Sequence, residues 1–146
     1  MSDFRRLTDT IWASPQITVD DVARAANEGF ALVINNRPDG EAKDQPAGDE
    51  IAAAAQEHGL GYMAIPVGHS GFSEPQIAAM TQALDSADGK VLAYCRSGTR
   101  STLLWAMAEA SRGRDPAELA QAAQSAGYDL APIAPMLEML AARSKG

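Results

Sequence analysis

Residues 90–110, KVLAYCRSGTRSTLLWAMAEA, decide the fold of this chain because they read in turn as a strand, a loop and a helix. The apolar run 91–94 is typical of a strand that is buried on both faces. One face of the helix repeats apolar residues at i, i+3, i+4 and i+7, namely Leu103, Ala106, Met107 and Ala110. A loop in this position can direct several backbone N–H groups at one anion, and the helix N-terminus adds its positive dipole end.

The loop between that strand and that helix carries the reactive residue. Cys95, the only cysteine of the chain, stands at its start, with Arg96 and Arg100 close by. Cationic neighbours and a helix N-terminus favour a thiolate, so the loop predicts a Cys95 nucleophile beside an anion cradle. A lone cysteine after a strand is often only a small buried apolar residue. Residues 95–100 hold two arginines, two hydroxyls and a glycine, which suit a bound anion better. The predicted cradle is Arg96, Ser97, Gly98, Thr99, Arg100 and Ser101.

Length and composition favour one ordinary globular domain over residues 1–146. The net charge of −7 argues against nucleic acid as a partner. The chain has neither an apolar run of membrane-spanning length nor a signal peptide at its start, so we expect no membrane contact and a cytoplasmic location. One cysteine and two histidines exclude a disulfide framework and make a structural zinc site unexpected, and nothing in the sequence implies a metal or a cofactor.

Apolar strand segments begin near residues 31, 62 and 91 and alternate with helical patterns. This alternation predicts a mostly parallel sheet with helices on both faces. The start of the chain, around Leu7 and Ile11, predicts one or two short strands more. Helix caps are predicted at Thr18, Ser73 and Asp115. A last helix is predicted as well, with an inner face formed by Ile133, Met136, Leu137 and Leu140.

Ligands of such sheets bind beyond the carboxyl ends of the strands. Three loops leave those ends, at residues 35–40, 66–72 and 95–101, so they can meet in space. The first two supply a second group of site candidates, for each of which a plain turn or surface role is an equal alternative: Asn36, Arg37, Asp39, His69 and Ser70. The loop at residues 41–48 is either a solvated connector or a segment that overhangs the site.

The motif CRSGTRS resembles the active-site loop of rhodanese-type sulfurtransferases and, less closely, the Cys-x5-Arg loop of cysteine-dependent phosphatases. Together with NNRPDGE at residues 35–41 and IPV at residues 65–67, it resembles the phosphatase-like domain of beta-lactamase-hydrolase-like proteins over about residues 3–112. The resemblance implies a dual-specificity-phosphatase-like α/β fold, with Cys95 as the nucleophile and residues 96–100 as the anion cradle. It also implies a persulfide dioxygenase as a candidate partner, because some relatives carry this domain beside one.

The chain departs from the phosphatase pattern in two ways. Four residues separate Cys95 from Arg100 where phosphatases have five, and Ser101 stands at the phosphatase arginine position. The loop at residues 66–72 also lacks the aspartic acid that protonates the leaving oxygen, which leaves His69 or Asp39 as substitutes. Transfer of a sulfane sulfur expels a good leaving group and needs no such acid.

The leading hypothesis from the sequence is therefore a sulfurtransferase that works through a Cys95 persulfide. Its donor would be thiosulfate or a persulfide, and a thiol would be the acceptor. The alternative is a phosphomonoester hydrolase with a Cys95 phosphoryl intermediate. The third hypothesis is a non-catalytic domain that binds an anion or docks a partner.

Overall fold

One central sheet organises the computed structural model, which describes residues 2–68 and 70–145. Within those residues the sheet has five strands in the order β1-β2-β5-β3-β4. β1 runs antiparallel to β2, and all other neighbours are parallel, as the sequence predicts. The strands are β1 (Arg5–Arg6), β2 (Ile11–Ser14), β3 (Phe30–Asn35), β4 (Gly61–Ala64) and β5 (Lys90–Tyr94).

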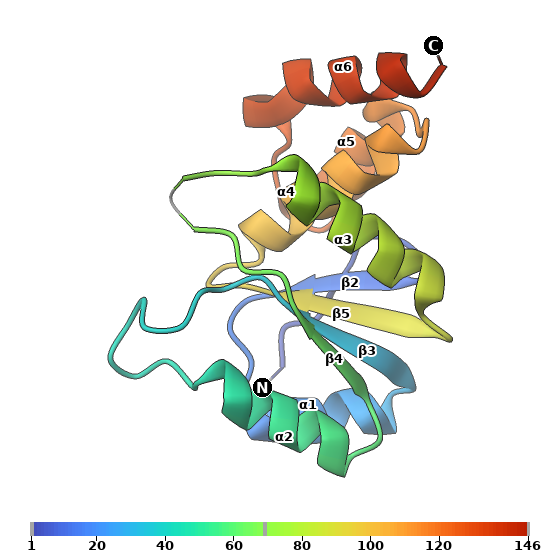
Figure 1. Cartoon of the computed structure of the whole chain (residues 1–146). Helices are drawn as coiled ribbons and strands as arrows, with labels where there is room; N and C mark the ends of the chain where they lie inside the picture. Colours follow the sequence, from blue (N-terminus) through green and yellow to red (C-terminus); the bar gives the residue numbers. More distant parts are fainter. Residues whose placement is uncertain (1, 69, 146) are drawn as a thin grey trace.

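Helices cover both faces of the sheet, which confirms the predicted layers (Figure 1). One face carries α1 (Val19–Asn27) and α2 (Gly48–Glu57). The other face carries α3 (Glu74–Ser86), α4 (Thr99–Ser111), α5 (Pro116–Ser125), the short η1 (Ala131–Ile133) and α6 (Ala134–Lys145). None of the helices in the described part of the chain is both long and apolar enough to cross a bilayer.

The predicted helix starts are confirmed by their side-chain caps. Thr18 and Ser73 each accept a hydrogen bond from the backbone N–H three residues on, and the side chains of Asp21 and Gln76 complete the two capping boxes. Asp115 caps α5 by accepting a hydrogen bond from the backbone N–H of Ala117, two residues on. These caps satisfy N–H groups that a helix cannot bond internally.

α4 is more buried than its sequence pattern predicts. Of the predicted stripe, Ala106, Met107 and Ala110 are fully buried and Leu103 is half-buried. The stripe is nevertheless too narrow, because the fully buried residues also include Leu104, Trp105 and Ala108. The reason is that the sheet lies on one side of α4 while α3, α5 and α6 pack on its other sides. The last helix differs in the opposite direction: Met136, predicted on its inner face, is 39% exposed.

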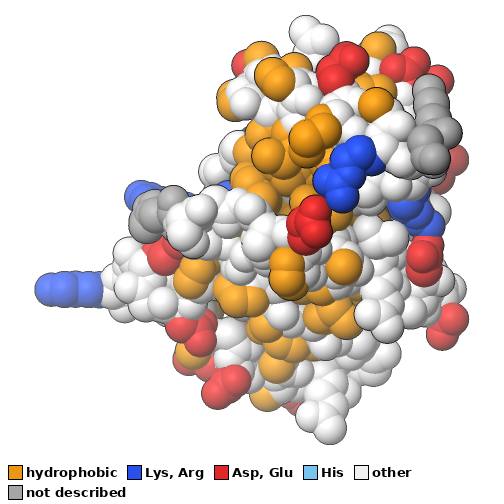
Figure 2. All heavy atoms as spheres, turned by 45° about the horizontal axis from the view of Figure 1, so that its top comes forward, with side chains coloured by type: hydrophobic (Ala, Val, Ile, Leu, Met, Phe, Trp, Pro, Cys, Tyr) orange, Lys and Arg blue, Asp and Glu red, His pale blue; other side chains and the backbone are white. Residues whose placement is uncertain are grey.

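A groove runs between α3 and α6 on the face that Figure 2 shows, where hydrophobic side chains gather. Its volume is about 510 Å³, with Ile77, Ala78 and Leu140 in its lining and Glu74 and Arg143 beside them. None of residues 95–101 lines this groove. The hollow on this helical face is therefore separate from the cysteine loop.

The register of the sheet brings the strand-exit loops together. Tyr94, the last residue of β5, pairs with Ser14 on one side and with Asn35 on the other. Asn35 in turn pairs with Ala64. Four parallel strands thus end at one level, and β5 lies between β2 and β3, so Cys95 emerges at the middle of the carboxyl edge.

Candidate active site

The loop after β5 wraps around a buried thiol. Cys95 is fully buried, and its Sγ accepts a hydrogen bond of 3.1 Å from the backbone N–H of Gly98. Gly98 has φ 92°, a left-handed backbone conformation that residues other than glycine rarely adopt, and it is the N-cap residue of α4. The hydroxyl of Thr102 donates to the Gly98 carbonyl oxygen at 2.8 Å. The positive end of α4 therefore faces the sulfur, as the sequence predicts.

The predicted cradle residues separate into exposed and buried members. Arg96, Ser97 and Thr99 are exposed, and the Ser97 hydroxyl donates to the Thr99 hydroxyl at 2.9 Å. Ser101 is fully buried, and its hydroxyl donates to Oδ1 of Asn36 at 2.7 Å. The Ser101 hydroxyl thus ties α4 to the loop after β3 instead of facing an anion.

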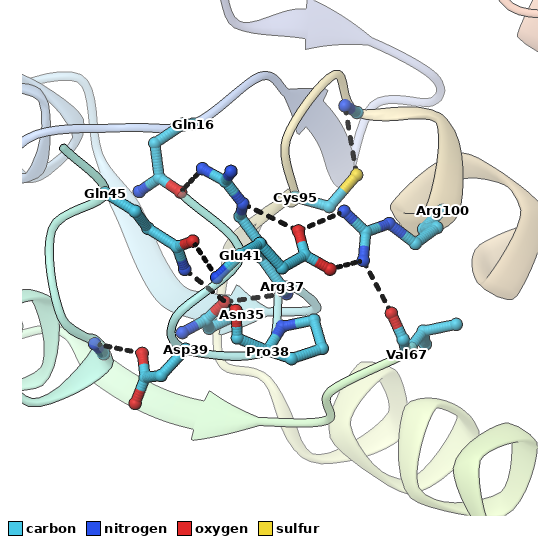
Figure 3. A network of polar contacts seen from close by, with 12 residues as sticks. Gln16, Asn35, Arg37, Pro38, Asp39, Glu41, Gln45, Val67, Cys95 and Arg100 are labelled. Carbon is cyan, nitrogen blue, oxygen red and sulfur yellow. Dashed lines mark hydrogen bonds and ion pairs between the residues drawn. The ribbon is translucent and has the colours of Figure 1, made fainter. Parts of the chain in front are cut away.

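Arg100 lies beside the thiol and is held by an acidic side chain that the sequence interpretation missed (Figure 3). Its Nη1 and Nη2 donate to the two carboxylate oxygens of Glu41 at 2.7 and 2.9 Å, and Nη1 also donates to the Val67 carbonyl oxygen at 2.7 Å. The bond to Glu41 and the nearby charge of Cys95 raise the pKa of Arg100. Within residues 2–68 and 70–145, the hydrogen bonds of this guanidinium to Glu41 and Val67 use Nη1 and Nη2 and leave Nε without an acceptor.

Glu41 lies between two guanidinium groups. Besides Arg100, it accepts a hydrogen bond of 2.9 Å from Nε of Arg37, whose side chain is only 5% exposed. Arg37 also donates to Oε1 of Gln16 at 3.0 Å. The bonds from Arg100 and then from Arg37 lower the pKa of Glu41 to about 2, so this carboxylate is ionised at any ordinary pH.

The sequence left two interpretations of the loop at residues 41–48, a solvated connector or a segment that overhangs the site. The second interpretation is correct for Glu41, which lies at the site. The only sequence signal for this role is the spacing of Arg37 and Glu41 within NNRPDGE, since an i,i+4 pair of opposite charge can form an ion pair. The partner on the cysteine loop, Arg100, lies 59 residues further along the chain.

The second group of candidates is divided by the structure. Asn36 is fully buried and donates from Nδ2 to the Ile65 carbonyl oxygen at 2.9 Å, so it joins the loops after β3 and β4 to α4. Asp39 accepts a hydrogen bond of 2.8 Å from the backbone N–H of Gly48 and points toward the start of α2, away from Cys95 (Figure 3). Ser70 is exposed, and His69 lies outside the described residues.

The described carboxylates near Cys95 are engaged in structural contacts. Glu41 is bound by two arginines and Asp39 by the start of α2, which makes both poor proton donors to a leaving group. Among the residues that the structure describes, no group of three or more His, Cys, Asp or Glu side chains is placed to hold a metal ion. The Cys95 sulfur at the N-terminus of α4, with Arg100 beside it, can support nucleophilic attack on a group that carries oxyanion charge.

The site combines a buried cysteine at the exit of the central strand with a glycine loop and a helix N-terminus beside an arginine. Together with the sheet and its helices, these features define the class of the cysteine-phosphatase-like folds. The solved structure of Tk-PTP in its active form shares this fold, with a TM-score of 0.73 over 97% of each chain at 17% sequence identity.

The chain belongs to the family of the phosphatase-like domain of beta-lactamase hydrolase-like proteins, whose family model matches residues 3–112. A beta-lactamase hydrolase-like protein of Xylella fastidiosa strain 9a5c is 35% identical over 133 residues, which are 90% of this chain and 31% of that protein. The chain thus spans about a third of the length of the curated relatives that it matches. A candidate phosphatase of Neisseria meningitidis, solved as a crystal structure, is 32% identical with a TM-score of 0.82 over 93% of this chain and 96% of that one. These findings confirm the resemblance on which the sequence interpretation rests.

Proposed function

We propose that this protein is a cysteine-dependent hydrolase of the phosphatase type that acts on a phosphomonoester. The observation that carries the proposal is the placement of the Cys95 sulfur, which receives the Gly98 N–H at 3.1 Å at the start of α4 with Arg100 alongside. An N–H donor, a helix N-terminus and a guanidinium together place positive charge beside this nucleophile. The helix N-terminus and the guanidinium also suit the equatorial oxygens of a phosphoryl group.

The proposed reaction has two displacement steps. The Cys95 thiolate attacks phosphorus, a sulfur–phosphorus bond forms, and the ester oxygen leaves with the bonding electron pair and takes a proton from water. Water then attacks the phosphocysteine, gives up a proton to solvent, and releases inorganic phosphate and the thiolate. Arg100 binds the phosphoryl oxygens through its Nε edge, while Glu41 holds its other edge in place.

Sulfur transfer, the leading hypothesis from the sequence, becomes the second candidate. Family membership and fold favour the hydrolase, but two features of this chain still favour sulfur chemistry. Only four residues separate Cys95 from Arg100, and the described carboxylates at the site are held by other groups. In that reaction Cys95 would take the outer sulfur of thiosulfate or a persulfide, and a thiol would accept it, with a persulfide dioxygenase as a candidate partner.

A pair of incubations separates the two chemistries. With p-nitrophenyl phosphate, we expect phosphate release by the wild-type protein and a loss of at least ~1,000-fold in Cys95→Ser, because a serine hydroxyl is a far weaker nucleophile here. With thiosulfate followed by a thiol, intact-mass measurement should show no sulfur adduct. A Cys95-dependent gain of one sulfur atom that a thiol reverses, without phosphate release, would replace the hydrolase proposal by sulfur transfer.

A further inference from the structure

Tyr128 packs against the cysteine loop from a distant part of the chain. It follows α5, lies beyond the residues that match the family model, and is 7% exposed. Its hydroxyl donates to the carbonyl oxygen of Ser97 at 3.0 Å. The contact thus joins a residue of the C-terminal region to the peptide group just before Gly98.

That peptide group is the one that contacts the nucleophile. The Ser97 carbonyl and the Gly98 N–H belong to a single planar peptide, and in a trans peptide the two point in opposite directions. Tyr128 binds the carbonyl end, and the N–H end donates to Cys95 Sγ at 3.1 Å. A turn of this peptide about its flanking bonds would replace a donor to the sulfur by a carbonyl dipole that repels it. Hydrogen bonds in series also polarise and strengthen each other.

The tyrosine ring is fixed in this position by its surroundings. The Arg5 guanidinium lies 5.1 Å from the ring centroid and is itself paired with Asp3 at 3.0 Å. A Cβ added at Gly98 would lie 2.0 Å from the Tyr128 hydroxyl oxygen, which shows that this oxygen packs closely against Gly98. Burial, together with the charge of Cys95, raises the pKa of Tyr128, so the hydroxyl keeps the proton that it donates.

We infer that Tyr128 is a positioning residue that orients the Ser97–Gly98 peptide toward the Cys95 sulfur and thereby controls the reactivity of that sulfur. Tyr128 would act only through that peptide. The consequence for turnover rests on the proposed function, whereas the consequence for thiol reactivity does not depend on any substrate.

The test measures the rate of Cys95 alkylation by iodoacetamide as a function of pH in the whole chain. Cys95 is the only cysteine, so intact mass reports its modification without ambiguity. In Tyr128→Phe, which keeps the ring beneath Arg5, the midpoint of the rate profile should rise by about 0.5 pH unit, because one hydrogen bond in the series is lost. Thermal unfolding of the same sample checks that the variant is folded.

Tyr62→Phe is the matched control. The Tyr62 hydroxyl also takes part in a hydrogen bond of 3.0 Å, which it accepts from Asn35, and among the described residues it has no hydrogen bond with the cysteine loop. Its alkylation midpoint should equal that of the wild-type protein. An unchanged midpoint in folded Tyr128→Phe, or an equal shift in Tyr62→Phe, would overturn the inference. If the shift appears while the wild-type protein releases no phosphate, the proposed hydrolase fails and the role of Tyr128 stands.

Discussion

Gly98→Ala is expected to lower phosphate release about 100-fold and to lower the free energy of unfolding by about 2–4 kcal/mol. Two costs add at this position. The φ of 92° is unfavourable for alanine, and the new Cβ would lie 2.0 Å from the Tyr128 hydroxyl oxygen and 2.8 Å from its Cζ. The Cβ atom and the ring cannot both keep their places, so the loop moves and the Gly98 N–H leaves the Cys95 sulfur. The measurements are steady-state phosphate release and urea unfolding.

Gly29→Ala is the control for the backbone cost alone. Gly29 has φ 87°, but an added Cβ would meet no atom within 4 Å. It should lose only about 1 kcal/mol of unfolding free energy and keep its phosphate release. Equal losses of stability in the two variants would show that the contact with Tyr128 contributes nothing.

Glu41→Gln is expected to lower the unfolding free energy by about 3 kcal/mol at pH 7, because it leaves the buried Arg37 and the adjacent Arg100 without their shared anion. The pKa of Glu41 falls from its ordinary 4.5 to about 2 on folding, which indicates a contribution of the same order. Phosphate release should fall as well, because Arg100 loses the partner that fixes its orientation. The measurement is urea unfolding of both proteins over a range of pH.

The same shift predicts how the Glu41→Gln effect depends on pH. Since folding lowers this pKa, the stabilisation by Glu41 is fully present above about pH 4.5 and is lost as the pH falls toward 2. The difference between wild type and Glu41→Gln should therefore shrink over that interval. A difference that stays constant down to pH 2.5 would mean that packing, and not charge, explains the loss.

Glu28→Gln provides the comparison for a surface ion pair. Glu28 binds Arg24 at 2.7 Å one helical turn away, but these side chains are 41% and 54% exposed. Water screens such a pair, so the variant should lose less than ~0.5 kcal/mol.

Hydrophobic patterning and helix caps in the sequence were sufficient to predict most of the fold. The alternation of apolar strands with helices gave the parallel sheet, and Thr18 and Ser73 marked two helix starts correctly. These signals are local, because a cap or a strand pattern acts on residues only a few positions away. α4 is buried on all sides because α6, which is distant in sequence, packs against it. The single apolar stripe predicted for α4 therefore underestimated how much of the helix is buried.

The sequence by itself also determined the placement of Cys95 between a strand and a helix N-terminus, because strand, loop and helix are contiguous there. Only the tertiary structure decided what surrounds the thiol. Glu41 meets Arg100 across 59 residues, Ser101 meets Asn36 across 65, and Tyr128 meets Ser97 across 31. These partners are brought together by strands that end at one edge of the sheet and by the packing of helices. Neither arrangement can be predicted from the spacing of residues along the chain.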